Sequence, residues 1–186
     1  MNTTIVHRGV QQIKNATPQS SNTLTGVHGD NLKNVAQQKI VLFSLEGPRY
    51  ALSVSEVVTV ERAVDITHLP KAPEVVSGVI NFHGEIIPVL DIRKLFRLPQ
   101  RDVQLEDQFI IARTSRRLVA LAVDSVNGVY DLDQYQTTGG EAFAFTEYLS
   151  GIATIEHGIV LITDLEKFLS LDEERILDVA LTEGEQ

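Results

Sequence analysis

The chain has 186 residues, no cysteine, no tryptophan and a formal net charge of −9. The lack of cysteine excludes disulfides, thiolate nucleophiles and cysteine-ligated metals. No apolar run approaches the ~20 residues that a membrane helix needs, so we expect no direct insertion into a membrane. The first residues lack the apolar core of a secretory signal, and we therefore expect a cytoplasmic protein.

The charge is distributed unevenly along the chain. Residues 1–39 carry four basic residues and one acidic residue, whereas the remainder carries 12 basic and 24 acidic residues. An acidic body repels a polyphosphate backbone, so we expect no nucleic-acid partner.

Residues 1–39 are rich in Asn, Gln, Ser, Thr and Gly. Such a segment buries too little apolar surface to offset the entropy of ordering it, so we expect a flexible N-terminal extension. The alternative is a short helix that forms on a partner through the few apolar residues near the start: Ile5, Val6, Val10 and Ile13.

The folded domain is predicted to span residues 40–182 and to begin with a short apolar strand at Ile40. The turn signal Gly47-Pro48 ends that strand. Alternation of apolar with polar residues then predicts one half-buried strand from Tyr50 that continues as far as Val60.

Pro73 suits the first turn of a helix, and the valines after it predict a short helix over residues 73–78. The apolar runs on either side of His83-Gly84 predict a β-hairpin. Asp91 is predicted to cap a one-turn helix over residues 92–96.

The second half of the chain predicts a similar series. Strands are expected over residues 109–114, 118–124 and 126–132, followed by a hairpin that turns at His157-Gly158. Asp164 is predicted to cap a further short helix, as Asp91 does in the first half.

The segment Ser170–Glu173 has the form of a capping box and predicts the start of a C-terminal helix. Four residues are expected to form the apolar face of that helix: Leu171, Ile176, Leu177 and Leu181. We expect the last residues of the chain to fray.

The two halves also match each other directly. Residues 51–60 align with residues 120–129, and residues 78–96 align with residues 151–169 without a gap. Two copies are too few for a solenoid, and about ten short strands indicate small barrels. The sequence therefore predicts two related β units that pack together and leave a groove, unless the match merely reflects a shared richness in valine.

No catalytic signature is present. The chain lacks a phosphate-binding Gly-rich loop and a nucleophile elbow, and its five histidines do not have the spacing of a zinc site. Asp91 and Asp164 are the best-placed acids, and helix capping explains both. We expect no catalytic residue, no metal and no cofactor.

We therefore expect the groove between the two units to be the site of function. Val57, Val60 and Val129 occupy related places in the two copies, near the expected junction. They are either core residues or the lining of a surface that accepts an apolar segment of a partner.

Six segments between residues 40 and 180 carry a family resemblance: Val41–Leu45, Tyr50–Leu52, Leu69–Pro73, Val76–Arg93, Val123–Val126 and Glu147–Ile152. In these segments the chain resembles the CheW-like domain of bacterial chemotaxis adaptors. The resemblance covers most of the folded part and none of the N-terminal extension.

The resemblance implies an all-β fold of two intertwined five-stranded SH3-like barrels, with short helices and a C-terminal helix. It also implies a non-catalytic adaptor that couples methyl-accepting chemoreceptors to the regulatory domain of the histidine kinase CheA. Such a protein would work at receptor arrays on the inner face of the membrane. In the family the hairpin tip of the receptor docks between the barrels, and the matching positions are Val57, Thr59, His83, Phe109 and Val129.

The sequence departs from the family at two of these positions. His83 stands where the family usually has arginine, and Thr59 stands where a glutamate is common. Histidine is shorter than arginine and mostly neutral near pH 7, so the departure affects the choice of receptor more than the fold.

The sequence can be interpreted in terms of three functions. The adaptor is favoured by the motifs and the duplication, and a variant of it is a scaffold of a divergent, non-flagellar chemosensory or motility pathway. A second possibility is a regulatory module that binds another component through residues 1–39. An enzyme would need acids or histidines that converge in a pocket, and the sequence offers none.

Overall fold

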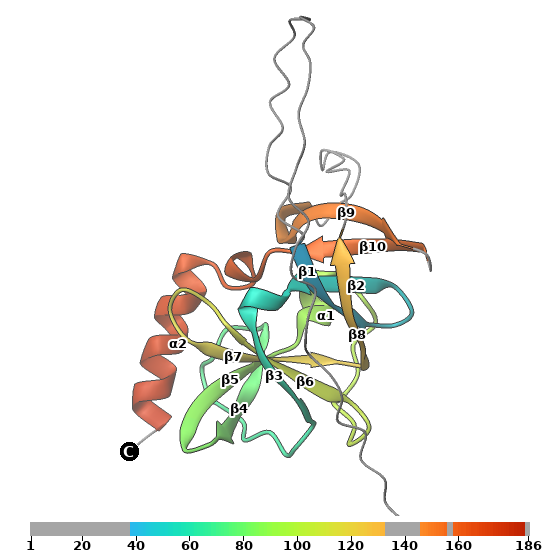
Figure 1. The fold of residues 1–186 in the computed structure, drawn as a ribbon. Helices are drawn as coiled ribbons and strands as arrows, with labels where there is room; N and C mark the ends of the chain where they lie inside the picture. Colours follow the sequence, from blue (N-terminus) through green and yellow to red (C-terminus); the bar gives the residue numbers. More distant parts are fainter. Residues whose placement is uncertain (1–37, 133–145, 156–157, 185–186) are drawn as a thin grey trace, which may run out of the picture. The chain divides into compact units, whose positions relative to one another are not determined.

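The computed structural model of the chain describes residues 38–132, 146–155 and 158–184, and Figure 1 shows their arrangement. The strands of the first half are β1 (Gln38–Ser44), β2 (Arg49–Ser53), β3 (Val57–Arg62), β4 (Val76–Phe82) and β5 (Glu85–Leu90). Those of the second half are β6 (Gln108–Arg113), β7 (Leu118–Val123), β8 (Ser125–Leu132), β9 (Leu149–Ile155) and β10 (Gly158–Thr163). The helical elements are η1 (Val54–Glu56), α1 (Ile92–Leu95), η2 (Thr146–Tyr148), η3 (Leu165–Lys167) and α2 (Leu171–Gly184).

The strands form two five-stranded sheets that exchange parts of the two halves. The first sheet has the order β8-β1-β2-β10-β9, and the second has the order β3-β6-β7-β5-β4. Each half therefore gives two strands to one sheet and three to the other. This arrangement confirms the predicted all-β fold of two intertwined SH3-like barrels.

The registers of the two sheets show that the internal repeat is structural. Ala51 of β2 pairs with Ile162 of β10, and the matching residue Ala120 of β7 pairs with Val89 of β5. Both pairs are parallel, whereas every other strand pair is antiparallel. The alternative that the halves match only through their valine content is therefore wrong.

Three hydrophobic clusters fill the structure. One lies inside each sheet, and residues at matching positions of the repeat build both: Ile40, Leu42 and Ala51 in the first sheet correspond to Phe109, Ile111 and Ala120 in the second. The third cluster is shared, since it takes side chains from both sheets, from α1 and from α2.

Strand β7 shows how the shared cluster joins the sheets. All six of its residues are buried. Val119, Leu121 and Val123 belong to the shared cluster, whereas Leu118 and Ala120 belong to the interior of the second sheet. A strand that is buried on both faces reads as a continuous apolar run, which is why this segment shows no alternation.

The predicted single strand from Tyr50 to Val60 is wrong. The helical turn η1 separates β2 from β3 and carries the chain from the first sheet to the second. A capping box fixes the turn: the Ser53 hydroxyl accepts from the Ser55 N–H at 3.4 Å, and the Glu56 carboxylate accepts from the Ser53 N–H at 3.0 Å. Local alternation continues through the turn, so the pattern gave no sign of the change of sheet.

The predicted helix over residues 73–78 is also wrong, because these residues form a turn that leads into β4. Gly78 lies within β4 at a register shift, where it pairs with Val89. Its φ is +153°, and a Cβ atom there would lie 2.3 Å from the backbone oxygen of Thr67. The glycine therefore permits a close approach of two backbone segments and does not end a helix.

The hairpin predictions are confirmed where the structure describes them. His83 and Gly84 both have positive φ, as the favoured two-residue hairpin turn requires, and join β4 to β5. In the second half β9 pairs with β10, while His157 lies outside the described residues.

The two predicted aspartate caps differ. Asp91 accepts a hydrogen bond from the Arg93 N–H at 3.2 Å and caps α1 as expected. Asp164 makes no side-chain capping bond; its carboxylate pairs with Lys167 Nζ at 3.1 Å instead.

The C-terminal helix α2 begins with the predicted capping box, in which the Ser170 N–H donates to Glu173 Oε2 at 2.8 Å. Leu177 is buried, but Leu171 and Ile176 are 71% and 48% exposed. The buried face of α2 instead includes Glu174, whose carboxylate lies 2.9 Å from Arg117 Nη2. The ion pair allows this charged side chain to be buried, at a position outside the four that were predicted to form the apolar face.

The domain boundaries follow from these elements. Strand β1 begins at Gln38, two residues before the predicted start, and α2 extends to Gly184. Residues 1–37 lie outside the described residues, so the predicted flexible extension stays a prediction.

We predict that Gly78→Ala lowers stability by about 1–3 kcal/mol, because the added methyl group cannot avoid the Thr67 carbonyl. Urea denaturation followed by circular dichroism measures the change. Gly184→Ala is the control, since its added carbon would lie 3.3 Å from only the flexible tip of Leu69. Equal stability of Gly78→Ala and the wild type would contradict the role assigned to this glycine.

The second prediction concerns Glu56. Burial raises the pKa of this carboxyl above its usual value, and the backbone N–H of Ser53 only partly opposes that effect. The negative charges of Asp164 and Glu166 raise it further. Because the folded state holds this proton more tightly than the unfolded state, ionisation of Glu56 lowers stability as the pH rises through the folded pKa.

Glu56→Gln removes this ionisation. Relative to the wild type, the variant should therefore gain stability as the pH rises from about 4 to about 7. Urea denaturation of both proteins at a series of pH values measures the difference. A difference that stays constant with pH would be the contrary result.

Candidate partner-binding site

The five predicted contact residues lie on four elements. Val57 and Thr59 are half-buried on β3, and Val129 is 59% exposed on β8. His83 is exposed at the β4–β5 turn, and Phe109 lies in β6.

Strands β3 and β8 occupy matching places in the two halves and each forms the outer strand of its sheet. Val57 of β3 and Val126 of β8 both pack partly against the shared cluster. The two strands also meet through β6, because the Val126 N–H donates to Gln108 Oε1 at 2.6 Å. We call this region, formed by β3 and β8, the strand seam.

The strand seam presents exposed apolar side chains next to half-buried ones. Val58 and Val129 are 50% and 59% exposed, whereas Val57 is partly covered. Outer strands with free backbone groups and apolar side chains are suited to contact another chain. The structure therefore brings Val57, Thr59 and Val129 into a region with the properties of a docking surface.

His83 is placed differently. It lies at the tip of the hairpin that includes β4, and β4 and β3 are the two opposite outer strands of the second sheet. Its ring makes an edge contact with Phe82, with 4.4 Å between the ring centroids. No strand pairing connects His83 to Thr59 in the described part of the chain.

Phe109 is 0% exposed and belongs to the cluster inside the second sheet. Its side chain has no surface to offer a partner, so its assignment as a direct contact is wrong. Phe109 pairs with Glu61 of β3, and its side chain belongs to the interior cluster of the second sheet. Ile40, at the matching position of the repeat, belongs to the interior cluster of the first sheet.

An ionic cluster that the sequence did not indicate lies beside the strand seam. Asp124 lies between β7 and β8, where the chain returns from the second sheet to the first. Its carboxylate accepts hydrogen bonds from the Arg93 guanidinium, from Arg101 Nη2 at 2.6 Å and from the Glu46 N–H at 2.6 Å. Nothing in the sequence around Asp124 indicates this cluster, since the arginines are far away along the chain.

Arg101 extends this cluster to Asp107. Its guanidinium donates to both carboxylate oxygens of Asp107, each at 2.7 Å. Burial by itself raises the pKa of Asp107, but the bonds from Arg101 and from the Gln104 N–H outweigh it and hold that pKa below its usual value. The same pairing raises the pKa of Arg101, so both groups stay charged at neutral pH.

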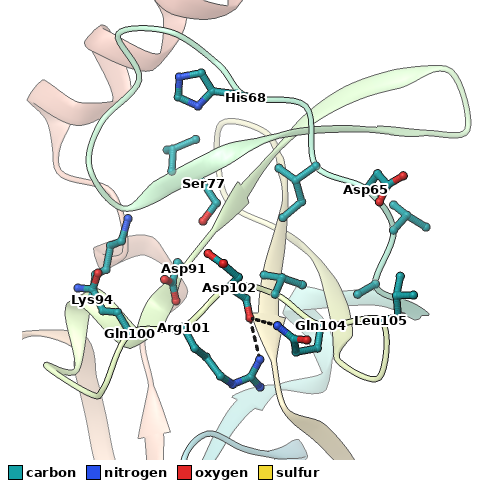
Figure 2. A pocket seen from close by; sticks show the side chains of 15 residues that line it. Asp65, His68, Ser77, Asp91, Lys94, Gln100, Arg101, Asp102, Gln104 and Leu105 are labelled. Carbon is teal, nitrogen blue, oxygen red and sulfur yellow. Dashed lines mark hydrogen bonds between the residues drawn. The ribbon is translucent and has the colours of Figure 1, made fainter.

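A cavity with a volume of about 620 Å³ lies at the end of β3 (Figure 2). It is bounded by the loop after β3, by α1 and by the loop before β6. Acidic and basic groups line it together, among them Asp91, Lys94 and Arg101. None of the five predicted contact residues lines this cavity.

The described residues contain no group of three or more histidine or carboxylate side chains placed to hold a metal ion. No helix in the described ranges combines the length and apolar character needed to cross a membrane.

Comparison with known proteins gives the family. Residues 39–173 match the family model of the CheW-like domain. The chain belongs to this family.

Relatives agree with this assignment. The CheW-like chain is 28% identical over 146 residues to the chemotaxis protein CheW of Klebsiella aerogenes, which covers 76% of this chain and 87% of that protein. The crystal structure of the scaffolding protein TtCheW from Thermoanaerobacter tengcongensis matches with a TM-score of 0.67 and 30% identity, over 74% of this chain and 95% of that one. A segment that makes up 14% of the chemotaxis protein CheA of Borreliella burgdorferi is 28% identical to 67% of this chain.

These findings confirm the resemblance and the predicted function class: the CheW-like chain is a signalling adaptor of bacterial chemotaxis. Family membership supports an adaptor over an enzyme.

The placement of two valines predicts different effects on the stability of this CheW-like domain. Val57→Arg puts a charge against the shared cluster and should cost about 1–3 kcal/mol, whereas Val129→Asp on the exposed side of β8 should cost at most about 1 kcal/mol. Urea denaturation measures both. Unfolding of the domain by Val129→Asp would show that Val129 belongs to the core.

Proposed function

We propose that this adaptor couples methyl-accepting chemoreceptors to the regulatory domain of the histidine kinase CheA and holds both in one complex. It does so by binding, without a chemical step. The observation that carries the proposal is the strand seam, where two outer strands from different sheets each present an exposed apolar side chain, Val58 on β3 and Val129 on β8.

The receptor's hairpin tip is the proposed occupant of the strand seam. A helical hairpin offers rows of apolar side chains on one face, and such a face complements Val58 and Val129. Val57 and Thr59 would form the floor of the contact, because both are half-buried on β3. His83 would meet the partner only at the margin, from the tip of the β4–β5 hairpin.

The kinase is the second proposed partner. The similarity between this chain and a segment of a CheA protein supports a regulatory domain of related fold on the kinase side. Two domains that share the double-barrel arrangement can present matching strand edges to each other. If the kinase contacts a surface other than the strand seam, the receptor and the kinase can bind the adaptor at the same time.

The proposed place of work is the cytoplasm, at receptor arrays on the inner face of the membrane. A chemoreceptor holds its signalling tip there, and an adaptor needs no membrane anchor of its own to reach it. A divergent, non-flagellar chemosensory pathway uses the same surfaces, and His83 in place of the family's arginine would then suit a different receptor.

Val129→Asp tests the receptor contact. The carboxylate would be desolvated against the apolar face of the hairpin, so we predict at least about tenfold weaker binding to nanodiscs that carry a chemoreceptor from the same genome. Isothermal titration calorimetry measures the affinity. Ile159→Asp is the matched control, because Ile159 is 67% exposed on β10, away from the strand seam.

Equal binding by Val129→Asp and the wild type would contradict the proposed receptor site. Removal of residues 1–37 distinguishes the adaptor from a regulatory module that binds through its N-terminal extension. The adaptor should keep its affinity for full-length CheA after the truncation, whereas such a module should lose its partner.

A further inference from the structure

The strand seam has an unusual mechanical requirement. Its two strands, β3 and β8, belong to different sheets and are not paired with each other. No ladder of backbone hydrogen bonds therefore sets the distance between them. Their relative position depends on the shared cluster, against which Val57 and Val126 pack, and on the two places where the chain crosses between the sheets, at η1 and at Asp124.

The crossing at Asp124 is held by groups from three separate segments. Asp124 binds the end of β1 and the turn after it: its own N–H donates to the Ser44 carbonyl at 3.1 Å, and its carboxylate accepts from the Glu46 N–H at 2.6 Å. The Arg93 guanidinium of α1 and Arg101 of the following loop both donate to the same carboxylate. One side chain thus joins the start of β8 to both sheets.

The fold does not require this ionic cluster at a crossing. In the internal repeat Ser55 occupies the place of Asp124, at the crossing from β2 to β3. Ser55 is exposed and makes its side-chain contact with Ser53 Oγ, at 2.7 Å. The same crossing is therefore made once with a local capping box and once with an aspartate held by two arginines.

The second crossing also carries an energetic cost. Arg93 is 0% exposed, and its Nε and Nη1 atoms have no hydrogen-bond partner in the described part of the chain. A buried charge with unsatisfied donors costs stability, and a neutral side chain of similar size is often equally stable in such a place. Arg93 Nη1 also lies 3.6 Å from Asp91 Oδ1, so the buried guanidinium is paired with two carboxylates, those of Asp91 and Asp124.

A short series of contacts leads from Asp124 to the exposed part of β8. Two residues further on, the Val126 N–H donates to Gln108 Oε1 at 2.6 Å, and the Asn127 side chain accepts from Ser44 Oγ at 2.8 Å. Val129 follows in the same strand, opposite Val41 of β1. A shift at Asp124 would therefore move the apolar side chains of β8 relative to β3.

We propose that Asp124, held by Arg93 and Arg101, is a positioning residue that sets β8 against β3 and thereby determines the affinity for the chemoreceptor. Asp124 acts through the strand and need not touch the receptor. The inference rests on the proposed receptor contact at the strand seam.

The test compares Asp124→Asn with Arg101→Gln and with the double variant. Arg101 is on a loop and about one third exposed, so its replacement keeps the test valid if Asp124→Asn does not fold. We expect each single variant to bind chemoreceptor nanodiscs roughly tenfold more weakly. The double variant should lose less affinity than the sum of the two single losses, because the Arg101–Asp124 pair is removed in both, although Arg101→Gln also removes the bonds to Asp107. Binding to full-length CheA should be unchanged.

Hydrogen exchange of the β8 amides gives a readout that a purely stabilising role would not produce. We expect faster exchange in residues 125–132 of Asp124→Asn, with the amides of β6 and β7 unchanged. Ser55→Ala, at the equivalent crossing, is the matched control and should change neither the exchange of β8 nor the affinity.

Three results would overturn the inference: wild-type receptor affinity in both single variants, additive losses in the double variant, or equal losses for the receptor and CheA. The Val129→Asp variant separates this failure from that of the proposed function. If Val129→Asp loses receptor binding while the Asp124 and Arg101 variants keep it, the positioning role is rejected and the strand seam stands. If Val129→Asp binds the receptor normally, the strand seam itself is rejected.

Discussion

The cluster shared by the two barrels is the constraint on which the structure depends. Strand β7 places Val119, Leu121 and Val123 in it, while β2 contributes Tyr50 and Leu52 from the other sheet. Each fully buried side chain of this kind stabilises the fold by about 1.5–3 kcal/mol. A five-stranded unit of roughly 60 residues is marginal alone, so each barrel needs the surface that the other provides. The exchange of strands between the halves serves this need. Because the chain passes from the first sheet to the second and back again, the two barrels cannot come apart without unfolding.

The elements that could be predicted from the sequence are those with local causes. The hairpin at His83-Gly84, the Asp91 cap and the capping box at Ser170 each depend on residues within a few positions of one another. The errors occur where a distant segment decides. The strand predicted from Tyr50 to Val60 is divided because its two parts belong to different sheets, and Gly78 serves a contact with Thr67 that the pattern around Pro73 does not reveal.

The site shows the same limit. From the sequence, Val129 could be either a core residue or part of a surface, and only the structure places it on the exposed side of β8. Phe109 was misassigned because its strand is buried on both faces, which depends on the packing of the whole sheet. The pairing of Arg93 with Asp124 spans 31 positions of the chain, and no feature of either segment announces it. Charged residues that hold a structure together across such distances are visible only in the folded protein.

An adaptor without a chemical step has only its surfaces to transmit information. The internal repeat gives this chain two outer strands with similar side chains, and the sequence differences between the repeats make them unequal: a serine at one crossing, and an aspartate bound by two arginines at the other. Gene duplication can supply such a pair of surfaces at once, and later divergence can then fit each to its own contact.

The order of the strands has a consequence for synthesis on the ribosome. The second sheet consists of the consecutive strands β3 to β7, whereas the first sheet combines β1 and β2 with β8 to β10 from the far end of the chain. The strands of the second sheet can therefore pair with one another while translation continues. Strands β1 and β2 must wait for their remaining neighbours for roughly 5 to 20 s at ordinary elongation rates. During this interval two apolar strands lack most of their partners, and the nascent chain is then most exposed to aggregation and most in need of a chaperone.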